Sequence, residues 1–180
     1  MENRRYRHRT CFMLIFLTLV LFGCSIKTEG LIPDQSIETA RQFDKTVKVM
    51  EVEGGHASKF GREAYITNEQ YRDALFQTLM DAKIFSGVAK SGNADWNLHS
   101  EIITITTEAG VSPTYAIVVQ YWLVDPQTGE EIWRKGINTR HHVNWNEAFA
   151  GGTRIIMAVE GATKKNLTQL VQELSIADLH

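Results

Sequence analysis

The sequence predicts an α+β domain in two layers, in which a mostly antiparallel sheet is packed by two helices. Segments with the period of a strand and segments with the period of a helix follow one another as strand, helix, a meander of three strands, and helix. A strong turn signal at residues 125–129, Asp-Pro-Gln-Thr-Gly, joins the last two strands as an antiparallel hairpin. The chain has 180 residues, which is one domain's length once an amino-terminal leader is set aside.

The leader has the three parts of a bacterial secretory signal. Its charged start is followed by an apolar run at residues 11–22 and by the small residue Gly23. The run is shorter than the ~20 apolar residues that a membrane-spanning helix needs, so we predict that residues 1–23 are a signal peptide. An uncleaved signal anchor, or secretion without any role for Cys24, is the alternative. The positive charges of the start are Arg4, Arg5, Arg7 and Arg9.

The stretch Leu21-Phe22-Gly23-Cys24 resembles the lipobox of bacterial lipoproteins. The resemblance implies that Cys24 carries acyl chains, palmitate among them, and that the membrane is a partner through this lipid. Two chains already hold a protein stably on a bilayer. Ser25 after the cysteine implies sorting to the outer membrane of a Gram-negative bacterium, with the domain facing the periplasm.

Residues 24–43 are polar and are predicted to form a lipidated tether, with a short helical turn at residues 36–43. The domain proper is predicted at residues 44–180. Its first strand is expected at residues 45–52, which are rich in β-branched side chains, and the pair Gly54-Gly55 ends that strand.

A capping box predicts where the first helix of the domain begins. Thr67 supplies an oxygen for the free amides of the first turn, and Gln70 reaches back to the cap. We expect Ser86-Gly87 to stop the helix, with residues 84–85 packed under its end. The apolar stripe of this helix comprises Tyr71, Leu75 and Leu79.

Three strands are expected next, at residues 96–105, 115–124 and 131–139. The second of these is apolar on both faces, which is typical of an interior strand. Trp96, at the start of the first, is expected in the core. A long helix at residues 149–175 completes the chain, and its inward positions recur every three or four residues at Ile155, Val159, Ala162, Asn166, Leu170 and Leu174.

These features together resemble a group of small proteobacterial outer-membrane lipoproteins. The order of the elements is similar to the fold of CsgG-like, LpoB-like and YajG-like lipoproteins and of the amino-terminal domain of TolB. The resemblance spans nearly the whole chain after the leader, and it implies that fold without a shared set of catalytic residues. Besides the signal, it is carried by Gly54-Gly55, Trp96-Asn97-Leu98, Arg154, Glu160-Gly161-Ala162, Asn166-Leu167 and Leu170.

Composition and motifs argue against several classes of function. The net charge is −2, and the leader takes positive charge away with it, so the domain lacks the basic surface that nucleic-acid binding requires. Cys11 leaves with the signal and Cys24 is acylated, which excludes zinc sites built on cysteine. There is neither a Gly-x-Ser-x-Gly elbow nor a Gly-x-x-x-x-Gly-Lys phosphate loop. We therefore expect no catalytic residue and no cofactor.

The adjacent residues His141 and His142 raise the alternative of a metal site. Neighbours on a strand point to opposite faces of the sheet, so the two rings cannot chelate one ion together. A third ligand such as His99 or Glu101 would have to lie at the same level of the sheet. We expect no metal site and interpret the pair as surface or sheet-end histidines.

Trp145 lies in a polar stretch between the last strand and the last helix, without a periodic partner. We interpret it as an anchor for a binding partner, with packing against a loop as the alternative. The sequence thus predicts a non-catalytic binding or assembly component of the cell envelope, whose partner is an envelope protein or a second copy of the chain. The alternatives are an auxiliary lipoprotein of a transport or lipid-trafficking system and, less favoured, an envelope hydrolase or transferase.

Overall fold

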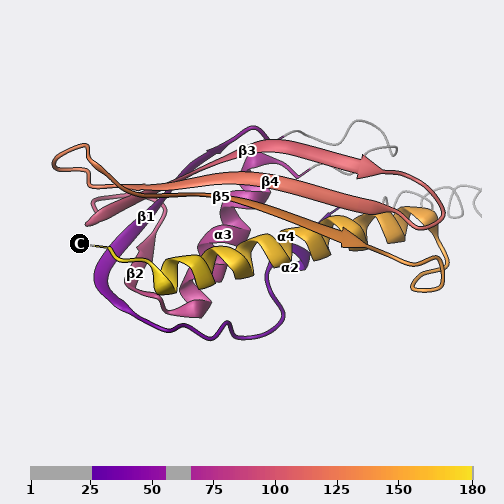
Figure 1. Ribbon diagram of the computed structural model, residues 1–180, viewed down its shortest axis with the longest axis horizontal. Helices are drawn as coiled ribbons and strands as arrows, with labels where there is room; N and C mark the ends of the chain where they lie inside the picture. Colours follow the sequence, from indigo (N-terminus) through magenta and orange to yellow (C-terminus); the bar gives the residue numbers. More distant parts are fainter. Residues whose placement is uncertain (1–25, 56–65, 180) are drawn as a thin grey trace, which may run out of the picture.

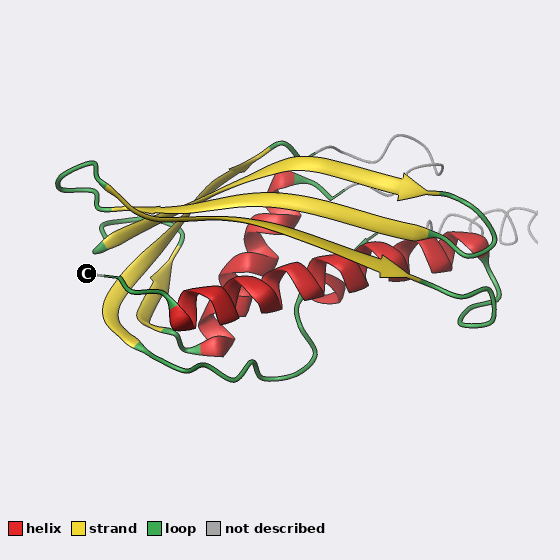
Figure 2. Ribbon diagram, viewed as in Figure 1, coloured by secondary structure: helices red, strands yellow, loops and turns green. Residues whose placement is uncertain are grey.

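Strand β4 (Thr114–Val124) alternates buried and half-buried residues along most of its length, so one face of the sheet is covered and the other is open. The computed structural model describes residues 26–55 and 66–179. In this part of the chain the helices lie against a single face of a twisted sheet (Figure 2). The predicted α+β fold in two layers is confirmed.

The sheet has five strands in the order β2-β1-β3-β4-β5 (Figure 1). β1 (Phe43–Glu53) lies between β2 (Phe85–Ala89) and β3 (Trp96–Glu108) and pairs with both in parallel. The predicted meander follows, because β3, β4 and β5 (Glu131–His142) pair antiparallel. The sheet is therefore mixed, and β2 and β5 are its two edges.

β2 is the strand that the local sequence pattern does not predict. The preceding helix already ends at Lys83, whose φ of 52° is left-handed, ahead of the expected stop at Ser86-Gly87. Phe85 is buried as expected, but it also opens a strand that pairs with Phe43. The rings of Phe43 and Phe85 both pack on Trp96, with centroids 5.9 and 6.2 Å away, and this contact holds the short edge strand in place.

The described helices are α2 (Thr28–Leu31), α3 (Asn68–Ala82) and α4 (Gly151–Ile176). The capping box of α3 is confirmed, since the amide of Gln70 donates to Thr67 Oγ1 and the amide of Thr67 donates to Gln70 Oε1, both at 3.1 Å. The core stripe of α4 is confirmed as well. Its fully buried members include Val159, Ala162, Leu170 and Leu174.

A buried polar cluster ties both long helices to the sheet. The hydroxyls of Tyr71 on α3 and Tyr121 on β4 lie side by side, 3.0 and 2.6 Å from Oδ1 of Asn166 on α4. The Asn166 amide donates to the carbonyl of Ile137 on β5 at 3.1 Å. Burial raises the pKa of both tyrosines, so their hydroxyls stay protonated. Because an unsatisfied buried polar group costs about 1–3 kcal/mol, this cluster favours one arrangement of α3 and α4 on the sheet.

The predicted tether is packed onto the domain over its described part. Ile26 and Leu31 are buried. The side-chain amide of Gln70, in the first turn of α3, donates to the carbonyl of Ile26 at 2.9 Å. The packed domain therefore reaches back at least to Ile26. We call residues 32–42, which follow α2 and lead into β1, the strap.

The helical turn expected at residues 36–43 is wrong, because the strap is irregular up to the start of β1 at Phe43. Two contacts hold this segment out of a helix. Phe43 pairs with Phe85 in the sheet, and Arg41 Nη1 donates to the carbonyl of Ala177 at 3.2 Å, just past the end of α4. Both partners lie far along the sequence, so the local pattern could not indicate them.

Candidate functional site

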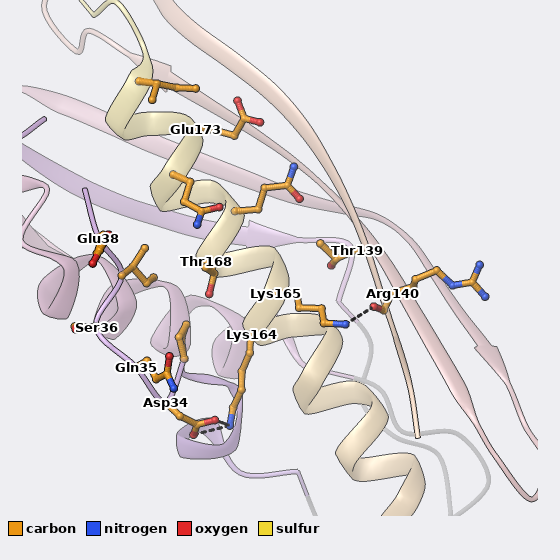
Figure 3. A pocket seen from close by; sticks show the side chains of 15 residues that line it. Asp34, Gln35, Ser36, Glu38, Thr139, Arg140, Lys164, Lys165, Thr168 and Glu173 are labelled. Atoms are coloured by element: carbon orange, nitrogen blue, oxygen red, sulfur yellow. Dashed lines mark hydrogen bonds and ion pairs between the residues drawn. The ribbon is translucent and has the colours of Figure 1, made fainter. Parts of the chain in front are cut away.

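A groove of about 1040 Å³ lies between the strap, α4 and the edge strand β5 (Figure 3). Residues 33–38 of the strap line one side of the groove, and Thr139 and Arg140 of β5 line the other. α4 lines the groove with a polar stripe, because its opposite stripe is buried against the sheet. The lining residues of α4 are Lys164, Lys165, Thr168, Gln169, Gln172, Glu173 and Ile176.

Lysines of α4 hold the two walls of the groove. Lys164 Nζ donates to both carboxylate oxygens of Asp34, at 2.7 and 2.8 Å, and so joins α4 to the strap. On the other side, Lys165 Nζ donates to the carbonyl of Arg140 at 3.3 Å. The guanidinium of Arg140 points away from α4 (Figure 3), so β5 presents mainly backbone to the groove at this residue.

The lining carries charges of both signs together with polar and apolar side chains, and the apolar ones are Pro33, Ile37 and Ile176. The acidic side chains are Asp34, Glu38 and Glu173, and the basic ones are Arg140, Lys164 and Lys165. Small-molecule sites are predominantly apolar with a few placed polar groups, whereas acidic and basic side chains of the strap and of α4 line this groove. This groove instead suits a polar polypeptide segment, which can exchange hydrogen bonds with amide, hydroxyl and charged side chains.

β5 is an edge of the sheet, since it follows β4 as the last strand in the order. An edge strand presents backbone groups that an extended segment of another chain can pair with. β5 carries the charged side chains of Arg134, Lys135 and Arg140. Charged side chains on an edge strand disfavour nonspecific β-pairing with other chains. The groove and the edge together form a surface on which an extended segment could lie between the strap and β5.

Trp145 belongs to a separate exposed surface at the end of the sheet. Its side chain is 69% exposed, that of Val111 is 70% exposed, and that of Phe149 is completely exposed. Val111 lies in the loop from β3 to β4, and the two aromatic residues lie in the loop from β5 to α4. The two loops are joined where the Val143 amide donates to the carbonyl of Pro113 at 3.0 Å. We call Val111, Trp145 and Phe149 the apolar tip.

The loop that presents the two aromatic residues is fastened by Arg154. Arg154 Nη1 lies within hydrogen-bonding distance of the carbonyls of Trp145, Ala148 and Phe149, at 3.4, 2.5 and 3.1 Å. In the same loop, the carboxylate of Glu147 accepts from the backbone and side-chain amides of Asn144, which lowers the Glu147 pKa. These hydrogen bonds fix the backbone of the loop in a conformation that leaves the side chains of Trp145 and Phe149 exposed.

The structure places His141 and His142 in different surroundings. The ring of His141 lies against Gly161 of α4, whereas Nδ1 of His142 lies 2.9 Å from Thr114 Oγ1 on the neighbouring strand. Among residues 26–55 and 66–179, no three histidine, cysteine or carboxylate side chains gather as a metal site would require.

Two sequence predictions fall at the amino-terminal end. Cys24 and the signal peptide at residues 1–23 lie outside the described residues. Within the described part, no helix is both long and apolar enough to cross a membrane.

The open face of the sheet carries a row of stacked side chains. The rings of His99 and Trp122 stack with centroids 5.1 Å apart, and Arg134 lies over Trp122 at 5.0 Å. Arg134 is also paired with Glu131. These groups contact one another across β3, β4 and β5, so the row stabilises the sheet surface.

Comparison with known proteins supports the fold. No family model and no curated protein matches the sequence. Among solved structures, a Xanthomonas campestris protein of family DUF330 has a TM-score of 0.59 at 13% identity, over 81% of this chain and 91% of that chain. A hypothetical protein from Chlamydia trachomatis has a TM-score of 0.51 at 10% identity, over 76% of this chain and 100% of that one. A minor lipoprotein from Acinetobacter baumannii has a TM-score of 0.49 at 11% identity, over 77% and 96%. At such identities the likenesses to the first two of these proteins show the fold alone.

Sequence reasoning singled out Trp145 but missed the groove. The groove has no local signal, because its walls come from the strap, β5 and α4, which are far apart in the sequence. Phe149 was within reach of sequence reasoning, since an aromatic residue directly before Ala150-Gly151 has no inward position on α4.

Proposed function

We propose that the protein is a lipid-anchored, non-catalytic binding component of the cell envelope, whose groove takes an extended segment of an envelope protein. The observation that carries the proposal is the groove beside the edge strand β5, whose lining combines charges of both signs with polar and apolar side chains. An extended segment can use both the backbone of such an edge and the polar side chains beside it. Hydrogen bonds to the main chain of β5 would then supply affinity for the bound segment. The side chains of the groove would select among segments of different sequence.

The proposed anchor is the lipid on Cys24, in the outer membrane and with the domain in the periplasm. Its support is the order of charged leader, short apolar run and Leu21-Phe22-Gly23-Cys24. Metabolic labelling with a fatty acid tests it: the wild type takes up label and Cys24→Ala does not. Equal labelling of the two proteins would rule out lipid attachment at Cys24.

The lining of the groove supports binding rather than catalysis. Its residues include neither a histidine nor a cysteine, and two of its carboxylates, Asp34 and Glu173, already form ion pairs with Lys164 and Lys135. General acid–base work needs a titratable group poised near the working pH and free to meet a substrate. Loss of cellular function in a folded His141→Ala, His142→Ala double variant would favour an enzyme or metal protein instead.

Crosslinking in intact cells tests the groove. A photoreactive amino acid in place of Gln169 lies in the groove, and the same replacement of Gln127 lies in the exposed turn between β4 and β5. We expect a discrete protein adduct from position 169 and none from position 127. An adduct with a second copy of the chain would identify self-association as the binding event. Absence of any adduct at 169, in a protein that is folded and exported, would contradict the proposal.

A variant in which a larger side chain fills the groove tests the same proposal in the opposite direction. Thr168→Trp places a large side chain in the groove, and we expect it to abolish the adduct formed at position 169. Gln127→Trp is the matched control, because it places the same side chain on the exposed turn between β4 and β5, and it should leave the adduct unchanged.

A further inference from the structure

The described chain begins at a fixed point on the domain. Ile26 is only 8% exposed, and its carbonyl accepts from the Gln70 amide at 2.9 Å. Cys24 precedes it by two residues, and two residues of extended chain span at most about 7 Å. A lipid on Cys24 therefore has almost no free tether, and the bilayer must lie close to the surface around Ile26.

The contacts that follow Ile26 place this surface in the half of the molecule that carries the apolar tip. Gly30, in α2, lies against the side chain of Glu160 on α4. The next residue of α4, Gly161, lies against the ring of His141, which is at the end of β5. The loop that presents Trp145 begins directly after β5. Figure 1 shows this loop at the end of the molecule opposite the carboxyl terminus.

The tip has the chemistry of a group that enters the interface of a bilayer. Trp145 and Phe149 are aromatic, exposed and adjacent in one loop, with the exposed Val111 on the neighbouring loop. Tryptophan is enriched at membrane interfaces because its ring is largely apolar while its N–H reaches polar groups. Arg154 keeps the carbonyls of this loop hydrogen-bonded, so the aromatic side chains can be buried in lipid without unfolding the loop.

We propose that the apolar tip inserts into the interfacial layer of the same bilayer that holds the lipid on Cys24. This inference rests on the lipid attachment in the proposed function and adds a second contact, made by the folded domain itself. With both contacts in place, the domain has one orientation on the membrane. The turn between β4 and β5, which lies at the same end as the carboxyl terminus (Figure 1), then faces away from the lipid.

Fluorescence quenching by lipids tests the second contact. The acylated chain is isolated from cells and reconstituted into vesicles of phosphatidylethanolamine and phosphatidylglycerol that contain a nitroxide-labelled lipid. Because the sequence has two cysteines, one in the leader and one acylated, an introduced cysteine is the single site for a fluorophore. The tip variants are Phe149→Cys and Val111→Cys. The controls are Gln127→Cys in the distant turn and Ile103→Cys, an exposed apolar residue on β3.

We expect the nitroxide lipid to quench the fluorophore at 149 and 111 several-fold more than at 127 and 103. Equal quenching at all four positions, in protein that carries the fatty acid, would overturn the tip contact and leave the anchor intact. Weak quenching at 149, together with disulfide-linked dimers when the Phe149→Cys variant is left unlabelled and oxidised, would assign the tip to a second copy and also overturn the proposal. Absence of the fatty acid from Cys24 would overturn the anchor, and the tip contact with it.

Discussion

The imidazole of His141 occupies the space that a side chain at Gly161 would need. A β-carbon built on Gly161 would come within 2.2 Å of His141 Cδ2 and 2.6 Å of Nε2. The close approach of α4 to the end of β5 therefore depends on the absence of a side chain at this position.

We accordingly predict that Gly161→Ala destabilises the protein, although alanine is the better helix former by about 1 kcal/mol. Overpacking costs typically about 1–3 kcal/mol, and the whole ring of His141 has to move. In the double variant Gly161→Ala, His141→Ala the ring is gone, so the free energy of unfolding should rise by the higher helix propensity of alanine. Urea unfolding of the single and the double variant would show this difference. A Gly161→Ala protein as stable as the wild type would mean that the ring is free to turn aside.

Leu170 tests how α4 is docked. It is fully buried at the centre of the stripe that faces the sheet, so Leu170→Ala should cost about 2–5 kcal/mol. Ile176→Ala is the matched control, because Ile176 is exposed at the end of the same helix, and it should change the free energy of unfolding by less than about 0.5 kcal/mol. Similar losses in the two variants would contradict docking by this stripe.

The buried cluster around Asn166 predicts an order of stabilities. Asn166→Leu keeps the volume but leaves the hydroxyls of Tyr71 and Tyr121 without their shared acceptor, and we expect a loss of about 1–3 kcal/mol. Tyr71→Phe keeps the bond from Tyr121 to Asn166 and should cost less. Chemical denaturation decides between them, and the reverse order would show that Asn166 is not the centre of the cluster.

Two histidines predict a pH dependence of stability. Burial lowers the pKa of His99 and of His141, and Lys165 lowers that of His141 further. The unfolded chain then takes up protons first as the pH falls below about 6.5. Stability should therefore be complete well above that pH and decline as the pH falls through it. Replacement of both residues by glutamine should flatten the decline in urea unfolding at these pH values, and an unchanged decline would assign it to other groups.

Arg154 predicts the order of the loop at the apolar tip. All three of its contacts with carbonyls are made by Nη1, and Arg154→Met removes this donor while keeping a long side chain. We expect faster amide hydrogen exchange at residues 144–149 in this variant. Arg140→Met serves as the control, because the guanidinium of Arg140 points away from α4. Equal exchange in both variants would mean that the loop is held by other contacts.

The sequence predicted those elements whose pattern is local. The capping box at Thr67 and Gln70, the hairpin turn at residues 125–129 and the inward stripe of α4 all follow from neighbours within a few residues. In the turn, Gly129 takes a φ of +74° and its amide closes back on Asp125, as the composition of that stretch indicates.

What the sequence did not predict depends on partners far along the chain. β2 forms because its residues pair with β1 in parallel, and a five-residue strand with Ser86-Gly87 at its centre has no strand-like period of its own. The docking of the segment that precedes the strap rests on Ile26 and Leu31, two apolar residues in a mainly polar stretch. The groove was missed for the same reason, since the strap that follows Leu31 is one of its walls.

The fastening of Ile26 to the first turn of α3 sets how this domain can meet other molecules. A lipoprotein on a long, loose linker samples a volume and can reach objects well away from its membrane. With the lipid that we propose on Cys24, this domain would be held within about 7 Å of its anchor and would move only by lateral diffusion in the membrane. The rate at which it meets a partner then depends on the number of partner molecules per area of membrane. A partner whose body lies away from the membrane has to extend a segment toward the domain.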